Sequence, residues 1–138
     1  GLPVGIGANI FSTVEGHISS ALFGVPAVKG VEFGAGFEFA NMTGYEANDF
    51  YSIKDGKIFV EKNNNGGIIG GMTDGAPIVV KAVIKPTPSI AKAQKSVNLQ
   101  TMQEEELSIH GRHDPCIVPR AVPVIESAVA FALLDLLA

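Results

Sequence analysis

A nearly continuous apolar segment runs from Pro119 to Leu137 and restricts how this chain can fold. Proline is favoured in the first turn of a helix. Apolar side chains then occur on nearly all sides: Val122, Val124, Ile125, Ala128, Val129, Phe131, Leu133, Leu134 and Leu136. A helix of this kind is predicted to be buried all round. Glu126 and Asp135 would each cost about 2.5–3.5 kcal/mol near a bilayer centre, so a core or subunit-interface helix over residues 119–137 is favoured over a membrane span.

Where this segment begins, residues 109–120 bring together two histidines, two arginines, an aspartate and the only cysteine of the chain. Gly111 and Pro115 bracket the charged residues, and proline both fixes its own φ and biases its predecessor toward extended conformations. The sequence therefore predicts a stiff, polar loop that leads into the apolar helix.

This loop admits three interpretations. In the first interpretation it is a solvated loop, since Asp-Pro is a common turn signal. In the second it is a zinc site built from His110, His113 and Cys116. The zinc interpretation is disfavoured because no second Cys/His pair elsewhere completes a tetrahedral set, and we predict no metal. In the third interpretation Arg112 clamps an anion and Asp114 acts as a base.

Composition narrows the class of protein. The chain has 138 residues, 46% hydrophobic and 17% charged, which predicts one globular domain with a substantial core. Its net charge of −4 and the lack of a Lys/Arg cluster argue against nucleic acid as a partner. A single cysteine forms no intrachain disulfide, which suits a reducing compartment. The chain opens Gly-Leu-Pro-Val, so we expect a piece of something longer or a processed product.

The first part of the chain predicts a strand, a helix and a second strand. Residues 3–11 read as a short strand with glycine breaks, and Ser12 with Glu15 matches a capping box. The helix that follows has Val14, Ile18, Ala21 and Leu22 at helical spacing and ends at Gly24 and Pro26. Residues 27–34 then predict a returning strand, in a βαβ-like or split unit, followed by a short helical segment through Met42.

Three further segments are polar or contain glycine and proline. Residues 43–57 predict a mobile surface loop. Residues 78–84 predict a strand that leads into Lys85–Ser89, where two prolines hold a cation and two hydroxyls in a rigid segment. That segment is either a phosphate-binding loop or a rigid linker. Residues 91–106 predict a strand pair or a loop at the surface.

Residues 63–75 are rich in glycine, with a Gly-Gly pair on each side of Ile68 and Ile69. Glycine has no Cβ and tolerates positive φ, so another group can approach this backbone closely. The Gly-Lys-Ser/Thr ending of a P-loop is missing. Two interpretations stay open, a tight turn at a sheet corner and a backbone wall for a planar ligand.

Four segments taken together resemble chorismate synthase: VPAVKGVEFGAGF (25–37), NNGGIIGGMTDG (64–75), KPTPSI (85–90) and GRHDPCIVPRAVPVIE (111–126). The resemblance covers nearly the whole chain and corresponds to the C-terminal portion of a family member. It implies a cytoplasmic flavin-dependent lyase of the shikimate pathway of aromatic amino acid biosynthesis. That enzyme removes phosphate and a ring hydrogen from 5-enolpyruvylshikimate 3-phosphate in a 1,4-anti elimination, with reduced FMN required but not consumed.

The resemblance also implies a fold and a set of site residues. The fold is α+β, a β-α-β sandwich with antiparallel sheet and packed helices, assembled as a homotetramer. The family's catalytic aspartate beside the flavin falls on Asp114, and an arginine that contacts FMN near the substrate falls on Arg112. The remaining cofactor-binding positions fall on Ala27, Gly70, Lys85, Pro86, Thr87, Pro88 and Ser89. Pro26 replaces the family's Asn, so the contact at Ala27 is expected through the backbone.

The chain also departs from the family pattern. Gly7-Ala8-Asn9-Ile10-Phe11 stands where Gly-Glu-Pro-Val-Phe is usual. The family's Gly-Glu-Ser-His motif, its second histidine and its arginine-rich motif do not occur, so we expect these residues to supply about half of an active site. The alternative is a non-catalytic flavin- or nucleotide-binding or assembly fragment of the same fold.

Overall fold

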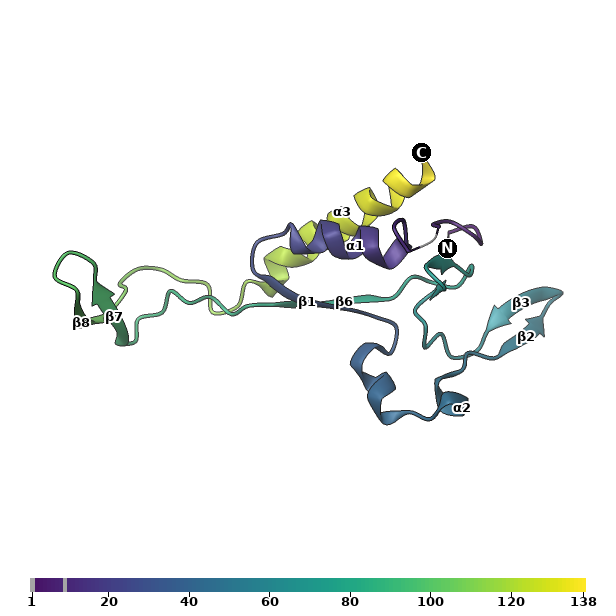
Figure 1. Cartoon of the computed structure of the whole chain (residues 1–138), viewed down its shortest axis with the longest axis horizontal. Helices are drawn as coiled ribbons and strands as arrows, with labels where there is room; N and C mark the ends of the chain where they lie inside the picture. Colours follow the sequence, from purple (N-terminus) through teal and green to yellow (C-terminus); the bar gives the residue numbers. More distant parts are fainter. Residues whose placement is uncertain (1, 9) are drawn as a thin grey trace.

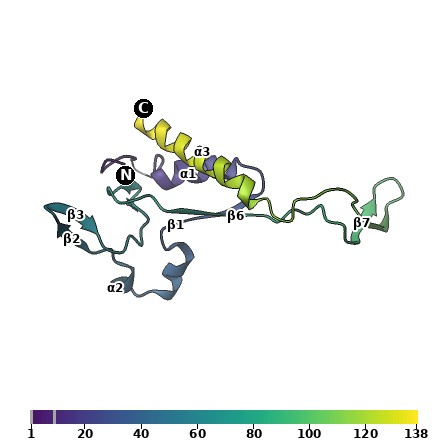
Figure 2. The same ribbon diagram turned by 180° about the vertical axis from the view of Figure 1, so that it is seen from behind.

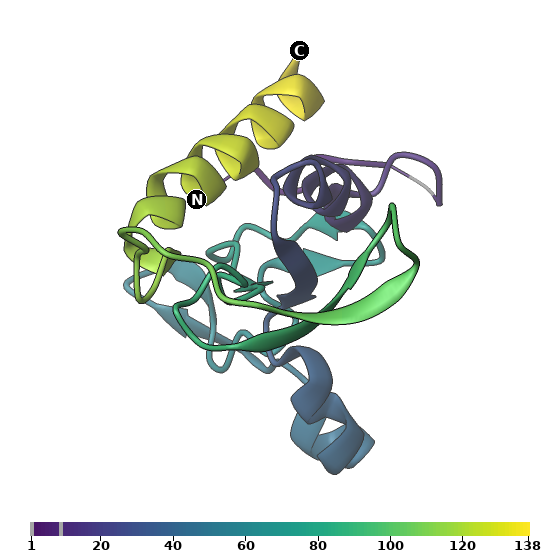
Figure 3. The same ribbon diagram turned by 90° about the vertical axis from the view of Figure 1, so that its left-hand side faces the viewer.

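Two helices, α1 (Val14–Phe23) and α3 (Val118–Leu137), lie side by side over one face of a two-stranded antiparallel sheet. The strands of this sheet are β1 (Val28–Phe33) and β6 (Val80–Ile84). Figure 1 shows the helices above this ribbon, and the end-on view in Figure 3 places η1 (Gly36–Asn41) and α2 (Gly44–Ala47) on the opposite side. The computed structural model describes residues 2–8 and 10–138.

The helix α1 begins one residue later than the predicted capping box. Thr13, not Ser12, is the N-cap, and its hydroxyl accepts a hydrogen bond from the Gly16 N–H at 3.0 Å. The extended backbone of Thr13 puts its side chain over the first turn, which is the geometry an N-cap requires. The predicted stop is confirmed, because Gly24 is the C-cap.

The predicted strand over residues 3–11 is wrong for its described residues. Gly5 donates a backbone hydrogen bond to the Thr73 carbonyl at 2.8 Å, and the Thr73 N–H donates to the Ile6 carbonyl at 2.9 Å. The extended run ends there because Gly5 and Gly7 adopt φ values of 85° and 100°, in the left-handed region that favours glycine. Asn9, within the segment that departs from the family pattern, lies outside the described residues.

The core forms where α1 packs on α3 and on the sheet. Val14, Ile18 and Leu22 are fully buried, which confirms the predicted apolar stripe of α1. Each such side chain contributes about 1.5–3 kcal/mol by leaving water. The core cluster is completed by Ile68 and Ala132, with Val31, Phe33 and Val80 of the sheet packed partly buried against it.

The predicted C-terminal helix is confirmed in extent, but the expectation that it is buried all round is wrong. Of the described residues of α3, Ala132 alone is buried, and its neighbours on that side are partly buried against α1. Large apolar side chains elsewhere on the helix surface are exposed: Val122, Val124, Phe131, Leu134 and Leu137. One helix partner covers one face, so the remainder of the apolar surface faces outward. No helix in the described part of the chain is both long and apolar enough to cross a membrane.

The remaining strands form separate antiparallel hairpins. The hairpin of β7 (Gln94–Asn98) and β8 (Gln103–Leu107) projects far from the helices, as Figures 1 and 2 show from two sides. The strands β2 (Tyr51–Lys54) and β3 (Lys57–Val60) lie at the opposite end. Of the two structures considered for residues 91–106, a strand pair or a surface loop, the chain forms the strand pair. The hairpin strands are β2 (Tyr51–Lys54) with β3 (Lys57–Val60), β4 (Ile68–Ile69) with β5 (Met72–Thr73), and β7 (Gln94–Asn98) with β8 (Gln103–Leu107).

The predicted short helical segment before Met42 is confirmed as the 3₁₀ helix η1 (Gly36–Asn41). The predicted loop over residues 43–57 is instead the short helix α2 (Gly44–Ala47) followed by the β2–β3 hairpin. Thr43 starts α2 with a capping box, in which the Glu46 carboxylate accepts from the Thr43 N–H at 2.8 Å. A local cap and a local turn therefore order a stretch whose composition alone predicts a loop.

The sheet topology decides between the architectures considered for the first half of the chain. The strands β1 and β6 pair antiparallel, and no strand precedes α1 among residues 2–8 and 10–13. The predicted βαβ-like unit is therefore wrong. Helices combined with small antiparallel sheets confirm the α+β class.

Candidate functional site

A hollow of about 540 Å³ lies between residues 86–91 and residues 111–115. These are the two segments for which the sequence allowed phosphate binding and proton transfer, and the fold brings them face to face. Its walls are formed by Pro86, Thr87, Ile90, Ala91, Gly111, His113, Asp114 and Pro115.

The strand β6 positions the first wall of this hollow. Residue Ile84 is the register partner of Val28, and directly beyond this pair the Lys85 N–H donates to the Ala27 carbonyl at 2.7 Å. Ala27 has a φ of 71°, an uncommon value for a residue with a Cβ. The structure thus brings Ala27 and Lys85, two predicted cofactor-binding residues, into direct backbone contact at the exit of the sheet.

Two side chains that line the hollow contain buried polar atoms without a hydrogen-bond partner. The Oγ1 atom of Thr87 and the Nε2 atom of His113 are both shielded from solvent, and neither has a hydrogen-bond partner within the described residues. Buried polar groups are nearly always paired, and an unpaired one costs about 1–3 kcal/mol. Because both atoms are shielded from water while the hollow is open to it, they lie behind its walls and do not face it.

Asp114 is paired with a residue that the sequence did not single out. Its Oδ2 atom lies 2.8 Å from the Nη1 atom of Arg120, in the first turn of α3. The N-cap of α3 is Ile117, without a side-chain cap bond, so Asp114 does not cap this helix. The sequence feature that could have indicated this pairing is the position of Arg120, directly after Pro119 at the start of the helix.

Four other predicted residues lie on the same two segments without lining the hollow. Lys85 and Arg112 are exposed, and Arg112 makes no ion pair or hydrogen bond to other residues that the structure describes. The Pro88 carbonyl accepts a hydrogen bond from Gln94 Nε2 at 3.4 Å, and Ser89 is half-buried. The two cations are therefore available at the rim.

Gly70 is not brought to the hollow. It lies in the turn between β4 and β5, exposed, with a φ of 60° and open space around it. The Val14 N–H donates to the carbonyl of the adjacent Gly71 at 2.9 Å, which places this turn at the start of α1. Ala27 follows the other end of α1, a helix about 15 Å long. The tight-turn interpretation of the glycine-rich segment is thus confirmed, and its contact with a ligand stays a prediction.

The residues considered for zinc do not assemble into a metal site. Cys116 is exposed and free, and no group of three His, Cys, Asp or Glu side chains suited to a metal occurs among the described residues. The glycine and proline breaks keep His110, His113 and Cys116 from sharing one helical face.

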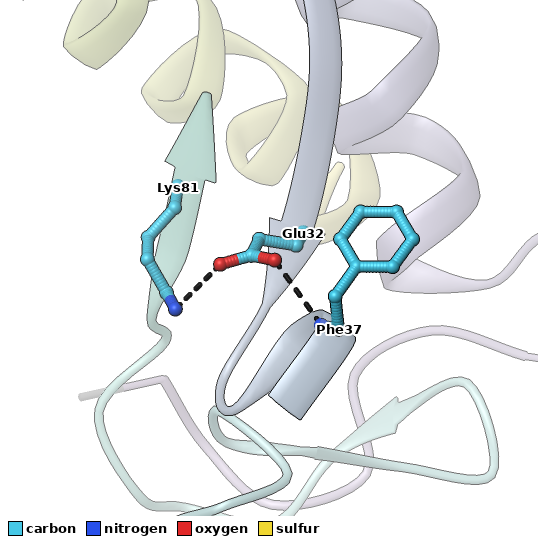
Figure 4. A network of polar contacts seen from close by, with 3 residues as sticks. All are labelled: Glu32, Phe37 and Lys81. Carbon is cyan, nitrogen blue, oxygen red and sulfur yellow. Dashed lines mark hydrogen bonds and ion pairs between the residues drawn. The ribbon is translucent and has the colours of Figure 1, made fainter. Parts of the chain in front are cut away.

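A second polar cluster lies on the sheet face that the helices leave uncovered. The Glu32 carboxylate pairs with Lys81 Nζ and accepts a hydrogen bond from the Phe37 N–H at 3.1 Å, as Figure 4 shows. The hydrogen bond from Lys81, and next that from Phe37, lower the pKa of Glu32 below its ordinary value. Strand register explains the pairing, because Glu32 and Lys81 are direct cross-strand partners.

Comparison with known proteins identifies the family. The chorismate synthase family profile matches residues 1–138. The chain is 54% identical over 134 residues to the chorismate synthase of Korarchaeum cryptofilum and 53% identical over 134 residues to that of Archaeoglobus fulgidus, covering 97% of this chain and 37% of each relative. A crystal structure of a chorismate synthase superposes with a TM-score of 0.71 at 33% identity, over 98% of this chain and 32% of that one.

These matches extend over nearly the whole of the described fold, the hollow included. The chain spans about 37% of the length of the curated relatives it matches. The chain belongs to the chorismate synthase family.

Proposed function

We propose that this chain forms part of a chorismate synthase, which eliminates phosphate from 5-enolpyruvylshikimate 3-phosphate to give chorismate. The observation that carries the proposal is the hollow itself. Two of the sequence segments that resemble the family form its two walls, with Thr87 on one wall and Asp114 on the other.

The residues around the hollow divide into binding and proton-handling groups. We assign cofactor binding to the rigid segment Lys85–Ser89, to the Ala27 backbone and to Arg112, whose charge compensates phosphate on either ligand. Proline at positions 86 and 88 reduces the ordering cost on binding. Gly70 remains a proposed contact for the far end of an extended ligand.

Asp114 is the proposed proton-handling residue. Its Oδ2 atom is engaged by Arg120, so Oδ1 is the oxygen available to accept or return a proton at the ligand. Reduced FMN, when bound, supplies the electron-rich flavin that the elimination needs and does not consume. Arg120 holds the carboxylate in one orientation, which is the condition for efficient proton transfer over a short distance.

The complete assembly is inferred to be the β-α-β sandwich and homotetramer that the family resemblance implies, in the cytoplasm. Support comes from two surfaces that the described residues leave open. One is the outward apolar side of α3, including Phe131 at 74% exposure and Leu134 at 63%. The other is the uncovered face of the β1–β6 sheet, where Val83 is 60% exposed. Large apolar side chains in such numbers mark surfaces that pack against further protein.

The rival function is a non-catalytic flavin-binding or assembly fragment with the same fold. The proposed function and this rival are distinguished by a chimera in which residues 1–138 replace the matching segment of a full-length relative. Chorismate formation from 5-enolpyruvylshikimate 3-phosphate, with reduced FMN under anaerobic conditions, is expected. A folded chimera that binds FMN without turnover supports the rival. The isolated 138-residue chain is expected to bind FMN weakly and to show no turnover.

A further inference from the structure

We propose that Asn65 is a deamidation site that the fold keeps unreactive, and that the Asp49 carboxylate does so by fixing the Asn65 side chain. The inference is independent of the proposed function. It starts from the sequence, in which Asn65-Gly66 is the only Asn-Gly pair. Asparagine followed by glycine is prone to deamidation because glycine has no side chain to hinder attack by its own nitrogen.

Deamidation at an Asn-Gly pair proceeds through a cyclic intermediate. The backbone nitrogen of Gly66 loses its proton and attacks Cγ of Asn65, and ammonia leaves as a five-membered succinimide forms. Water then opens the ring to aspartate or isoaspartate, so the net reaction consumes one water and releases one ammonia. It requires a Gly66 N–H that is open to base and an Asn65 side chain that can rotate over it.

The structure removes the second of these conditions. The Nδ2 atom of Asn65 donates to Asp49 Oδ2 at 3.0 Å, and the backbone N–H of Asn65 donates to the same oxygen at 2.8 Å. The other carboxylate oxygen, Oδ1, accepts from the Asn64 N–H at 2.6 Å. Hydrogen bonds to a charged acceptor are among the strong ones in proteins. Together these three hold the Asn65 amide in one orientation.

The attacking nitrogen is held as well. Gly66 is buried, and its N–H donates to the Asn63 carbonyl at 3.1 Å. A Cβ on Gly34 would stand 2.5 Å from the Gly66 nitrogen, so the backbone just beyond β1 packs directly against it. Loss of the Gly66 proton and entry of the water that opens the ring therefore both require local opening of this turn.

The same turn joins the two strands of the β1–β6 sheet, so deamidation would loosen that junction. The Ala35 N–H donates to the Asn64 carbonyl at 2.7 Å, and the Val79 N–H donates to the Gly66 carbonyl at 3.1 Å. A carboxylate at position 65 would lie beside the carboxylate that the amide now binds, where like charges repel and no donor remains. Asn65→Asp is therefore expected to lower the urea midpoint of the chain.

The test measures the rate of conversion at Asn65 by peptide mapping and mass spectrometry, in mildly alkaline buffer. In the urea-unfolded chain, Asn65 is expected to be the first asparagine to convert, whereas in the folded chain it is expected to stay intact over the same time. Folded Asp49→Ala is expected to convert at Asn65 about 10- to 100-fold faster than the folded unaltered chain, as for lost hydrogen bonds to a charged group.

Two further variants separate local protection from global stability. Ile18→Ala removes a fully buried side chain of α1 and leaves the turn untouched, so it is expected to keep the slow conversion at Asn65 while it stays folded. Should Asp49→Ala fail to fold, Asp49→Asn carries the test. It keeps the size and one acceptor oxygen of Asp49 but loses the charge, and is expected to convert about 10-fold faster at Asn65.

Equal rates of conversion in the folded and the unfolded chain would overturn the inference. So would a folded Asp49 variant that converts no faster than the unaltered chain, or an equal acceleration in Ile18→Ala, because protection would then come from global stability alone. An unchanged urea midpoint in Asn65→Asp would overturn the stated effect on the β1–β6 junction. Each of these outcomes leaves the proposed function as it stands, because none of the residues tested lines the hollow.

Discussion

The guanidinium of Arg120 lies 2.8 Å from the carboxylate of Asp114, Nη1 to Oδ2, and joins the first turn of α3 to the wall of the hollow. Both side chains are partly open to water, at 78% and 37% exposure. Exposed ion pairs typically contribute about 0–1 kcal/mol to stability. The pair therefore matters more for orienting the Asp114 carboxylate than for holding the fold together.

Arg120→Ala is accordingly expected to change the unfolding free energy by no more than about 1 kcal/mol in urea titrations. In the chimera described above it should lower kcat by up to about 10²-fold, the lower end of a general acid–base contribution, with FMN affinity kept. Arg120→Lys is the matched control and should restore part of the rate. A loss of stability that accounts for the loss of rate would contradict the orienting role.

Asp114→Asn is expected to affect kcat alone, whereas Arg112→Ala is expected to affect both kcat and ligand affinity. Asparagine keeps the size of Asp114 but removes its basicity, so kcat in the chimera should fall by about 10²–10⁴-fold with ligand affinity largely kept. Arg112→Ala removes a charge that acts in ground and transition states alike, so FMN or substrate binding should weaken along with the rate. Near-normal turnover in Asp114→Asn, or a loss explained entirely by FMN release, would make the carboxylate structural.

The Glu32–Lys81 pair predicts a loss of stability in acid. Because the pKa of Glu32 is lowered in the folded state, its carboxylate contributes stability above the ordinary pKa of 4.5. That contribution disappears as the pH falls from 4.5 through the folded-state pKa. Glu32→Gln should therefore reduce the urea midpoint at neutral pH and show a smaller loss in acid. Identical pH dependence of the two proteins, measured by circular dichroism, would refute this coupling.

Truncation in the core should be far more damaging than truncation at the surface. Ile18, in α1, is fully buried in the core cluster that α1 forms with α3 and the sheet. Ile18→Ala is therefore expected to cost about 2–5 kcal/mol of unfolding free energy. Ile53, in β2, is 77% exposed, and Ile53→Ala is the matched control with an expected change within about 0.5 kcal/mol. Equal midpoints in urea for the two variants would contradict the core assignment.

The outward side of α3 predicts self-association of the isolated chain. Phe131 and Leu134 are exposed by 74% and 63%, and burying them against a second copy removes apolar surface from water. Light scattering is expected to show oligomers at high concentration. Phe131→Glu with Leu134→Glu should give a monomer with an unchanged circular dichroism spectrum. A monomeric unaltered chain at high concentration would rule this surface out as a self-association site.

Sequence patterns are sufficient to predict the elements whose signals are local. The apolar spacing of Val14, Ile18 and Leu22 fixes the buried side of α1, and the β-branched run before Lys85 fixes β6. Its four family segments also predicted membership of the chorismate synthase family. These features follow from side-chain periodicity and turn residues, which act over a few positions along the chain.

Which of these elements contact one another depends on how the chain packs in three dimensions. The pairing of β6 with β1 sets Lys85 against Ala27, and the approach of residues 86–91 to 111–115 creates the hollow. Arg120 became a partner of Asp114 because the start of α3 lies beside that wall. The uneven burial of α3 likewise depends on how many elements pack against it. Contacts between segments that are far apart in the sequence depend on packing in the folded chain. Local sequence patterns do not specify such contacts.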